Sequence, residues 1–518
     1  MLDQLANYPT NKLANSKVWL ALALVAIAGA LIVLPLTSAV VVIGGALAVI
    51  ALLRWHELAL YALIFAVPFG SWFPIPISVG NLTAVDLLVT LVIALWLARM
   101  IVYERGIAIE LPPLSPAFAI FLFVALLSVT GALSLQHAAK EFTKWLEMFA
   151  VYVYVANNLD ATKMRRALVA MFLSGLVEAA IGVYQFWFRV GPEQFELFGR
   201  FMRAYGTFEQ PNPYAGYLAL IIPIALGIVV AVNRQPSTVN RQQLTVSSKT
   251  ESTSLFTVRC SLITDYWLLI TGCLALAAML AALLMSWSRG AWMGVAAALV
   301  ITVVVQSRRA FVVSLVIALV LVFIIMLSSL NIIPEAIAAR FSGIGDYFGV
   351  FDVRGVKVDD ANFAVVQRMA FWQTAWAMFS AHPLLGIGLG NYAVMYPAYA
   401  LPFWGEPLGH AHNYYLNVAA EAGLAGLAAY AILWAAAFWR GWRAVRVSHG
   451  MWRSVAAGLL GTLVALSIHN GFDNLFVHGM AVQVGIGLGM VEVIQNSKFI
   501  IRNSQDAIRN TKYVKRET

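Results

Sequence analysis

Long apolar runs separated by short polar segments dominate this chain, and most of them are long enough to cross a membrane. About 20 apolar residues in a helix span a hydrocarbon core of about 30 Å. Two runs, 58–70 and 145–157, are shorter and could be tilted or re-entrant, so we expect 12–14 transmembrane helices. The candidate spans are 18–34, 36–53, 58–70, 84–102, 115–133, 145–157, 166–188, 213–232, 266–286, 290–306, 310–329, 414–438, 453–469 and 475–494.

Composition supports an all-α polytopic membrane protein. The chain is 61% hydrophobic and 11% charged, with a mean hydropathy of +0.80, whereas a soluble protein carries about twice that charged fraction. A β-barrel would show alternating strands of about ten residues. The two cysteines, Cys260 and Cys273, suggest neither a disulfide framework nor a multi-cysteine zinc site. We expect 18–34 to be an uncleaved first span.

Basic residues predict the orientation. With the N-terminus in the cytoplasm, 24 of the 34 Lys and Arg residues fall on the cytoplasmic side and 10 outside. This bias is typical of membrane proteins, so the net charge of +9 does not require a nucleic-acid partner. The same orientation places 330–413 outside.

The predicted spans and their orientation divide the chain into four regions. The first, 1–329, is a bundle of about eleven spans with a Ser-, Thr-, Gln- and Asn-rich cytoplasmic loop at 233–265. The second, 330–413, is the one long hydrophilic excursion and forms a large extracytoplasmic loop. Residues 414–496 form the C-terminal transmembrane helices. The basic tail 497–518 is expected at the anionic inner leaflet.

Within the large loop, 366–380 has the spacing of an amphipathic helix. Such a helix could lie at the membrane interface, either as packing or as a guide for a lipid substrate. The glycine run 386–390 is a poor dinucleotide fingerprint, because no strand–helix unit surrounds it. The apolar stripe of the expected helix consists of Met369, Trp372, Trp376 and Phe379.

Two extracytoplasmic arginines, Arg203 and Arg289, lie among glycines, aromatics and prolines rather than in basic clusters. A guanidinium can bind phosphate oxygens in a bidentate manner, so two of them could hold a diphosphate. Gly206 and the prolines at 211 and 213 would let the backbone bend near a ligand. The alternative is that both arginines reach for lipid headgroups.

His410 and His412 end the loop directly before an apolar run. A neutral imidazole can take a proton from a hydroxyl nucleophile, which makes His412 a candidate general base. Alternatively the segment only caps the next helix, with Asn413 near its N-cap. A metal site would need ligands beyond this H-x-H pair.

Glu421 lies about nine residues into the predicted span 414–438. An ionisable residue there is a functional candidate, or it orients a neighbouring polar group. Together with Glu147 and Glu178 it also keeps a transporter open as an alternative.

These residues lie in stretches that resemble the O-antigen ligase family, which includes related O-antigen polymerases. The resemblance covers roughly 145–490. The stretches are Arg203 to Asn212, Ser288 to Trp292, His382 to Tyr392, and His412 to Leu416 with Glu421 to Gly423.

The resemblance implies a fold related to C-type membrane glycosyltransferases, with roughly a dozen helices, about two fewer than the longest count above. It implies an enzyme of lipopolysaccharide or polysaccharide biosynthesis in the bacterial inner membrane. The glycan would come from undecaprenyl diphosphate, on the extracytoplasmic face. A ligase places it on lipid A–core, and a polymerase places it on another lipid-linked unit.

The resemblance also implies site residues. Arg203 and Arg289 would hold the diphosphate and His412 would activate the acceptor hydroxyl, with no metal or cofactor required. His410 is a second candidate base, and we expect His410, Asn413 and Glu421 to contribute to the substrate site. Some members were proposed as bicarbonate transporters, which is the same alternative as above. The sugar, the acceptor and the oligomeric state stay open.

Overall fold

The computed structural model covers most of the bundle. The predicted span 18–34, most of the predicted spans 36–53 and 310–329, the tail 497–518 and the loop residues 330–351 lie outside the described residues. Those described are 55–70, 75–77, 80–104, 106–197, 199–234, 253–309, 311–313, 352–358 and 362–496, with Gly44, Ala51, Leu52 and Val316.

Two compact units make up the chain. The smaller contains 1–60 and 94–107, and the larger contains 61–93 and 108–518. In the smaller unit, Nη1 of Arg99 lies 2.8 Å from Nδ1 of His56. The candidate site lies wholly in the larger unit.

The N-terminal elements are helices with one short hairpin. They are α3 (Glu57–Phe69), β1 (Ile75–Ile77) antiparallel to β2 (Gly80–Leu82), α4 (Ala84–Arg99) with a π-helical turn (Met100–Glu104), α5 (Ser115–Ser128) with a 3-10 turn (Val129–Gly131), α6 (Leu135–Asn158) and α7 (Ala161–Phe188).

The remaining elements carry the candidate site. They are a 3-10 turn (Glu193–Phe195), β3 (Glu196–Leu197) antiparallel to β4 (Phe201–Met202), α8 (Pro211–Arg234), α10 (Thr253–Met285), α11 (Arg289–Val304), α14 (Phe363–Ala381), α15 (Tyr392–Tyr399), α16 (Tyr414–Val447), α17 (Gly450–His469) and α18 (Met480–Gln495).

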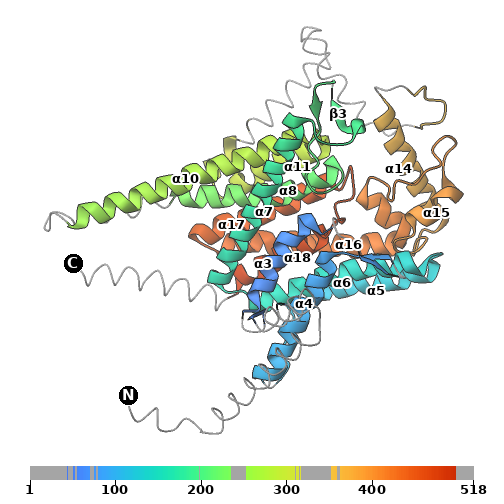
Figure 1. The fold of residues 1–518 in the computed structure, drawn as a ribbon. Helices are drawn as coiled ribbons and strands as arrows, with labels where there is room; N and C mark the ends of the chain where they lie inside the picture. The colour runs from blue at the N-terminus through green and yellow to red at the C-terminus, as the bar shows by residue number, and fades with distance from the viewer. Residues whose placement is uncertain are drawn as a thin grey trace, which may run out of the picture. The chain divides into compact units, whose positions relative to one another are not determined.

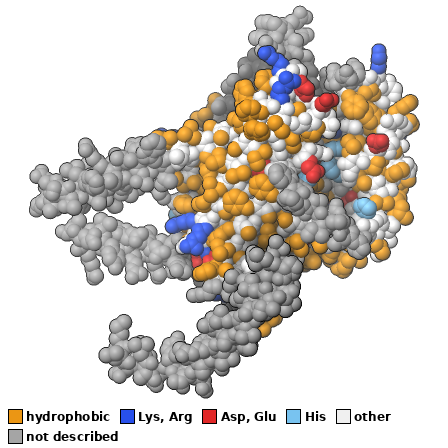
Figure 2. All heavy atoms as spheres, in the orientation of Figure 1, with side chains coloured by type: hydrophobic (Ala, Val, Ile, Leu, Met, Phe, Trp, Pro, Cys, Tyr) orange, Lys and Arg blue, Asp and Glu red, His pale blue; other side chains and the backbone are white. Residues whose placement is uncertain are grey.

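Membrane-spanning helices are present, as predicted. Five helices of the described residues are long and apolar enough to cross a bilayer, and the shorter apolar helices include α3, α11 and α18. On the face drawn in Figure 2, hydrophobic side chains cover most of the described surface, as expected where lipid replaces water. The five are Ala84–Val102, Ala161–Phe188, Pro211–Asn233, Tyr414–Val447 and Gly450–His469.

Polar side chains define where several helices begin. Ser134 and Asp160 accept hydrogen bonds from the first-turn N–H groups of α6 and α7, and Asn413 does the same for α16. Each satisfies a backbone donor that has no partner within its own helix.

Glycines let the helices of the core approach closely. Helix α17 packs against α8 and α11, which lie beside it in Figure 1. A Cβ at Gly227 of α8 would lie 2.3 Å from the carbonyl oxygen of Ser454, and one at Gly294 of α11 would lie 2.7 Å from that of Ala465. Small residues at such crossings are typical of membrane helices.

Several predicted boundaries differ from the structure. Helix α10 begins at Thr253, so 253–265 is helical although a loop was predicted at 233–265. Helix α6 begins ten residues before the predicted span 145–157, because its first turns are polar but capped by Ser134. Helix α18 begins at Met480 rather than 475, after a loop whose side chains bond to its own backbone.

The helix expected at 366–380 lies within α14, but its predicted stripe coincides with the buried face only in part, since Met369 is buried and Trp372 and Phe379 are half-buried. Trp376 is 58% exposed, whereas Phe371 is 1% exposed. Helix α14 packs on α16 (Figure 1), so tertiary contacts select a face that the aromatic spacing alone does not reveal. The buried residues are Val366, Met369, Ala370, Phe371, Thr374, Ala375 and Met378.

Helix α16 is broken at Gly423, where the backbone takes φ 64° and ψ −163°. The segment 383–388 fills the break. Ile387 and Gly388 donate their N–H groups to the carbonyls of residues 420 and 421, and residues 424 and 425 donate to the carbonyls of 383 and 384. The backbone groups freed by the break are therefore satisfied within the protein, as a membrane-embedded helix requires.

Candidate functional site

The loop that carries Arg203 is held by two side chains of α7. Gln185 accepts the N–H groups of Tyr205 and Gly206 at 3.1 and 2.7 Å, and donates to the Gly206 carbonyl at 2.8 Å. Glu178 accepts the N–H and the hydroxyl of Thr207 at 3.2 and 2.8 Å. Both side chains are buried, so the loop has a fixed position above the helix.

Arg203 is directed toward the turn between α10 and α11. Its Nε donates to the carbonyl of Ser286 at 2.9 Å, and the N–H of Ala204 donates to the carbonyl of Met285 at 3.0 Å. Among the described residues, no carboxylate lies within ion-pair distance of Arg203. Since Nε is already used, the two terminal nitrogens remain to bind a ligand.

The same turn leads into Arg289, the first residue of α11, whose side chain is exposed. The next residue, Gly290, lies against the end of α17. A Cβ there would be 2.9 Å from Cδ2 of His469 and 3.3 Å from Cβ of Phe472. This close approach brings the start of α11 to the loop 470–479 that follows α17.

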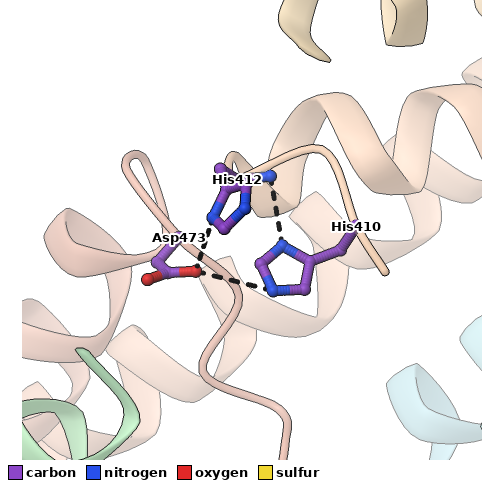
Figure 3. A group of neighbouring side chains, drawn as sticks. All are labelled: His410, His412 and Asp473. Carbon is purple, nitrogen blue, oxygen red and sulfur yellow. Dashed lines mark hydrogen bonds and ion pairs between the residues drawn. The ribbon is translucent and has the colours of Figure 1, made fainter. Parts of the chain in front are cut away.

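That loop carries Asp473, which faces the two loop histidines (Figure 3). Its Oδ1 lies 3.2 Å from Nδ1 of His412 and 3.6 Å from Nε2 of His410. It also accepts the N–H of Asn474 at 2.9 Å. The carboxylate is 7% exposed and the histidines are 18 and 19% exposed, so the group lies just below the protein surface.

His412 is held at several points. Its backbone has φ 49°, an uncommon conformation for a residue other than glycine. Its carbonyl accepts a hydrogen bond from Nε1 of Trp372 at 3.3 Å, and its ring lies 5.5 Å from that of Phe371. The neighbouring Tyr414 donates its N–H to the Asn470 carbonyl at 2.7 Å, which ties the start of α16 to the end of α17.

The hydrogen bonds made by the rings of His410 and His412 determine which nitrogen of each neutral ring carries the proton. Nδ1 of His410 accepts the N–H of His412 at 3.1 Å, so in the neutral ring of His410 the proton is on Nε2. In His412, Nδ1 faces the carboxylate of Asp473, so it carries the proton. The Nε2 of neutral His412 is then an acceptor, which is the form required of a general base.

Burial and neighbouring charges tune the site. Burial lowers the pKa of His410 to about 4. Burial alone would raise the pKa of Asp473, but the hydrogen bond from His412 and the nearby His410 hold it far below its usual value. Near neutral pH the site therefore contains an ionised carboxylate and a neutral His410.

Neighbouring positive charges affect the pKa of Arg203 and the pKa of Arg368. Burial, with Arg368 and Arg289 nearby, lowers the pKa of Arg203 to about 10. Burial and Arg289 also lower the pKa of Arg368, while Asp473 acts in the opposite direction. Arg368 is on α14 one turn before Phe371 and Trp372, the two residues that contact His412. Several like charges held close together favour binding of an anion.

The other predicted site residues have structural contacts. Asn413 is the N-cap of α16 and accepts the N–H of Leu416 at 3.1 Å. Glu421 is buried and accepts the N–H of Tyr392 at 3.0 Å, which orients the segment after the glycine run. This contact matches the orienting alternative considered above, and a substrate-binding role for either residue stays a prediction.

Asp473 was missed in the sequence, and Arg368 was not singled out as a site residue. The sequence does contain a feature from which Asp473 can be identified. It is a carboxylate in the short turn between two predicted spans, and alternation of the spans places that turn on the same side as His412. Arg368 is one of the ten basic residues predicted outside.

The crowding around Gly206 gives a testable prediction. Its φ is 55°, and an added Cβ would lie 2.2 Å from Oε2 of Glu178 and 2.3 Å from Cδ2 of Tyr214. We expect Gly206→Ala to lower the melting temperature in detergent and to displace Arg203. Gly199→Ala is the matched control, since Gly199 has φ 64° with no atom within 4 Å of an added Cβ. It should cost only the backbone strain of about 1–2 kcal/mol. Equal melting temperatures for the two variants would contradict the prediction.

One family of known proteins matches part of the chain. Residues 274–431 match the family described as O-Antigen ligase, so the resemblance stated from the sequence is confirmed over this segment. The segment includes Arg289, Arg368, His410 and His412. A search of curated proteins found no match.

Proposed function

We propose that this protein is a membrane glycosyltransferase of the O-antigen ligase type, acting on the extracytoplasmic face of the bacterial inner membrane. The donor is a glycan carried on undecaprenyl diphosphate, and the acceptor is a hydroxyl of a glycolipid or glycan. The observation that carries the proposal is the contact between Asp473 and His412, close to Arg203 and Arg289. These groups come from four separate segments of the chain, and the family match supports the reaction class.

Arg203 and Arg289 bind the diphosphate of the donor. The leaving group gains negative charge as its bond to the sugar breaks, so guanidinium groups placed around it stabilise the transition state. Ser286 directs Arg203 through Nε at 2.9 Å, and a pre-oriented donor loses less conformational entropy on binding.

His412 acts as the general base. The acceptor oxygen attacks the anomeric carbon and forms the new glycosidic bond. The bond from that carbon to the diphosphate oxygen breaks, and its electron pair leaves with the diphosphate. The hydroxyl proton passes to Nε2 of His412, while Asp473 holds Nδ1–H and stabilises the imidazolium. The products are the glycosylated acceptor and undecaprenyl diphosphate.

This function requires the site to be outside the cytoplasm, which gives a topology prediction. In a variant without Cys260 and Cys273, a cysteine at the exposed position 406 should react with a membrane-impermeant thiol reagent in spheroplasts. A cysteine at the exposed position 449, between α16 and α17, should react only after lysis. The reverse labelling pattern would exclude the orientation and the enzyme reaction with it.

A transfer assay tests the reaction itself. Purified protein, lipid-linked oligosaccharide and acceptor should yield glycosylated acceptor, and solute flux without transfer on any acceptor would favour a transporter instead. Surface glycans of a deletion strain separate the two enzyme types. Loss of all attached polymer indicates a ligase, and a single attached unit indicates a polymerase.

A further inference from the structure

The histidines and the carboxylate of the site also have the geometry of a metal-binding group. Nδ1 of His412, Nε2 of His410 and one oxygen of Asp473 all lie within 4.8 Å of one another. Three nitrogen and oxygen donors are the protein ligands of many zinc sites that keep a fourth position open.

Two of the three distances between the candidate ligand atoms fit a zinc ion. Metal–ligand bonds of about 2.0–2.2 Å in a tetrahedral site separate the ligand atoms by about 3.3–3.6 Å. The two separations that involve Asp473 are 3.2 and 3.6 Å. Only the two histidine nitrogens must move toward each other, and both rings are partly exposed and lie on a loop before α16.

We propose that His410, His412 and Asp473 form a binding site for Zn²⁺ or a similar divalent transition metal, and that bound metal inhibits the enzyme. The inhibition rests on the proposed function, whereas the metal binding does not. The metal has no part in the reaction. Bound metal prevents His412 from acting as the general base.

The inhibition follows from the ring proton of His412. A metal on Nδ1 takes the lone pair there, so the proton of the neutral ring must be on Nε2. Nε2 is then a donor and cannot accept the proton of the acceptor hydroxyl. The metal also occupies the carboxylate that would stabilise the imidazolium.

Metal binding also costs the protein a hydrogen bond. A metal on Nε2 of His410 moves that ring's proton to Nδ1, which now faces the N–H of His412 at 3.1 Å. Two donors cannot bond to each other, so the ring must turn and this hydrogen bond is lost. We therefore expect reversible binding rather than a permanently occupied structural site.

Metal binding is measured directly on the purified full-length chain without a polyhistidine tag. Zinc sulfate is titrated by calorimetry, and bound metal is counted by elemental analysis after dialysis. We expect His410→Gln and Asp473→Asn each to bind one zinc ion fewer per chain than the wild type. His449→Ala is the matched control, because His449 is exposed and lies at the start of α17, and it should bind as the wild type does.

Inhibition is measured separately in the transfer assay. Because a general base contributes about 10²–10⁴-fold to a rate, saturating zinc should lower transfer by about 100-fold, and a chelator should restore it. The activity that remains in His410→Gln should be less sensitive to zinc. Magnesium chloride should have no effect, since Mg²⁺ prefers oxygen ligands in octahedral geometry.

The outcomes separate the two proposals. Zinc bound equally by the wild type, His410→Gln and Asp473→Asn, with all three folded by circular dichroism, would overturn the metal site. Site-specific zinc binding in a protein that transfers no glycan would uphold the metal site and exclude the enzyme. Site-specific binding without inhibition of an active enzyme would overturn the inhibitory role.

Discussion

Replacing His412 by alanine should lower glycan transfer by about 10²–10⁴-fold, the usual contribution of a general base. The expectation rests on the hydrogen bond between Nδ1 of His412 and Asp473 at 3.2 Å, which leaves Nε2 as the acceptor. The measurement is the initial rate of transfer with purified protein, lipid-linked donor and acceptor. Donor binding should be retained, because the proposed ligands of the diphosphate are Arg203 and Arg289.

Companion variants sharpen this test. His410→Ala should lower the transfer rate less than His412→Ala does. His410 contacts Asp473 and the backbone N–H of His412, but it is not the proposed base. Asp473→Asn should give an intermediate loss, because an amide in place of the carboxylate no longer fixes the ring proton. His449→Ala, which changes the exposed residue directly before α17, is the control for general effects. Full activity of His412→Ala would exclude it as the base.

Arg289→Lys and Arg203→Lys should each lower transfer by about 10- to 100-fold, somewhat less than the loss seen when a transition-state donor is removed outright. Lysine keeps the charge but loses the planar pair of donors that matches a phosphate. In Arg203 the loss extends to the Nε contact with the Ser286 carbonyl at 2.9 Å, so the remaining ammonium is no longer directed. The measurement is transfer rate against donor concentration.

Arg189→Lys provides the matched control. Arg189 follows α7 on the same predicted side of the membrane, is 52% exposed and pairs with Glu196 at 2.6 Å. Surface ion pairs of this kind contribute little, so the variant should transfer at the wild-type rate. If both site variants did the same, binding to lipid headgroups would be the better account of Arg203 and Arg289.

The sequence was sufficient for the helical membrane class, and it singled out Arg203, Arg289 and His412, whose roles stay predictions. The reason is physical. Basic residues outside the cytoplasm are uncommon in such a chain, and a histidine pair directly before an apolar span is conspicuous for the same reason, since ionisable groups are few there. The structure adds that all three come from segments linked by backbone hydrogen bonds and close glycine contacts, such as Gly290 on His469.

Other features depend on contacts between distant segments and have no local signal. Asp473 becomes a site residue only because the end of α17 binds the start of α16 through the N–H of Tyr414. The exposed Trp376 of α14 shows the same limit, since aromatic spacing predicts a helix but not which face α16 covers. Gly423 lies in an apolar run of regular helical spacing. The break of helix α16 at this residue is stabilised by the segment 383–388, which lies about forty positions earlier in the chain.

That break has a consequence for how the protein is made. A helix that entered the bilayer already open at Gly423 would expose free carbonyl and N–H groups to hydrocarbon, at several kcal/mol each. Helix α16 should therefore leave the insertion machinery unbroken and open only when 383–388 docks. Docking then sets the direction of the nine residues before the break, which continue directly from His412. We therefore expect His412, the proposed base, to reach its final position late in biogenesis, after the helix is already in the membrane.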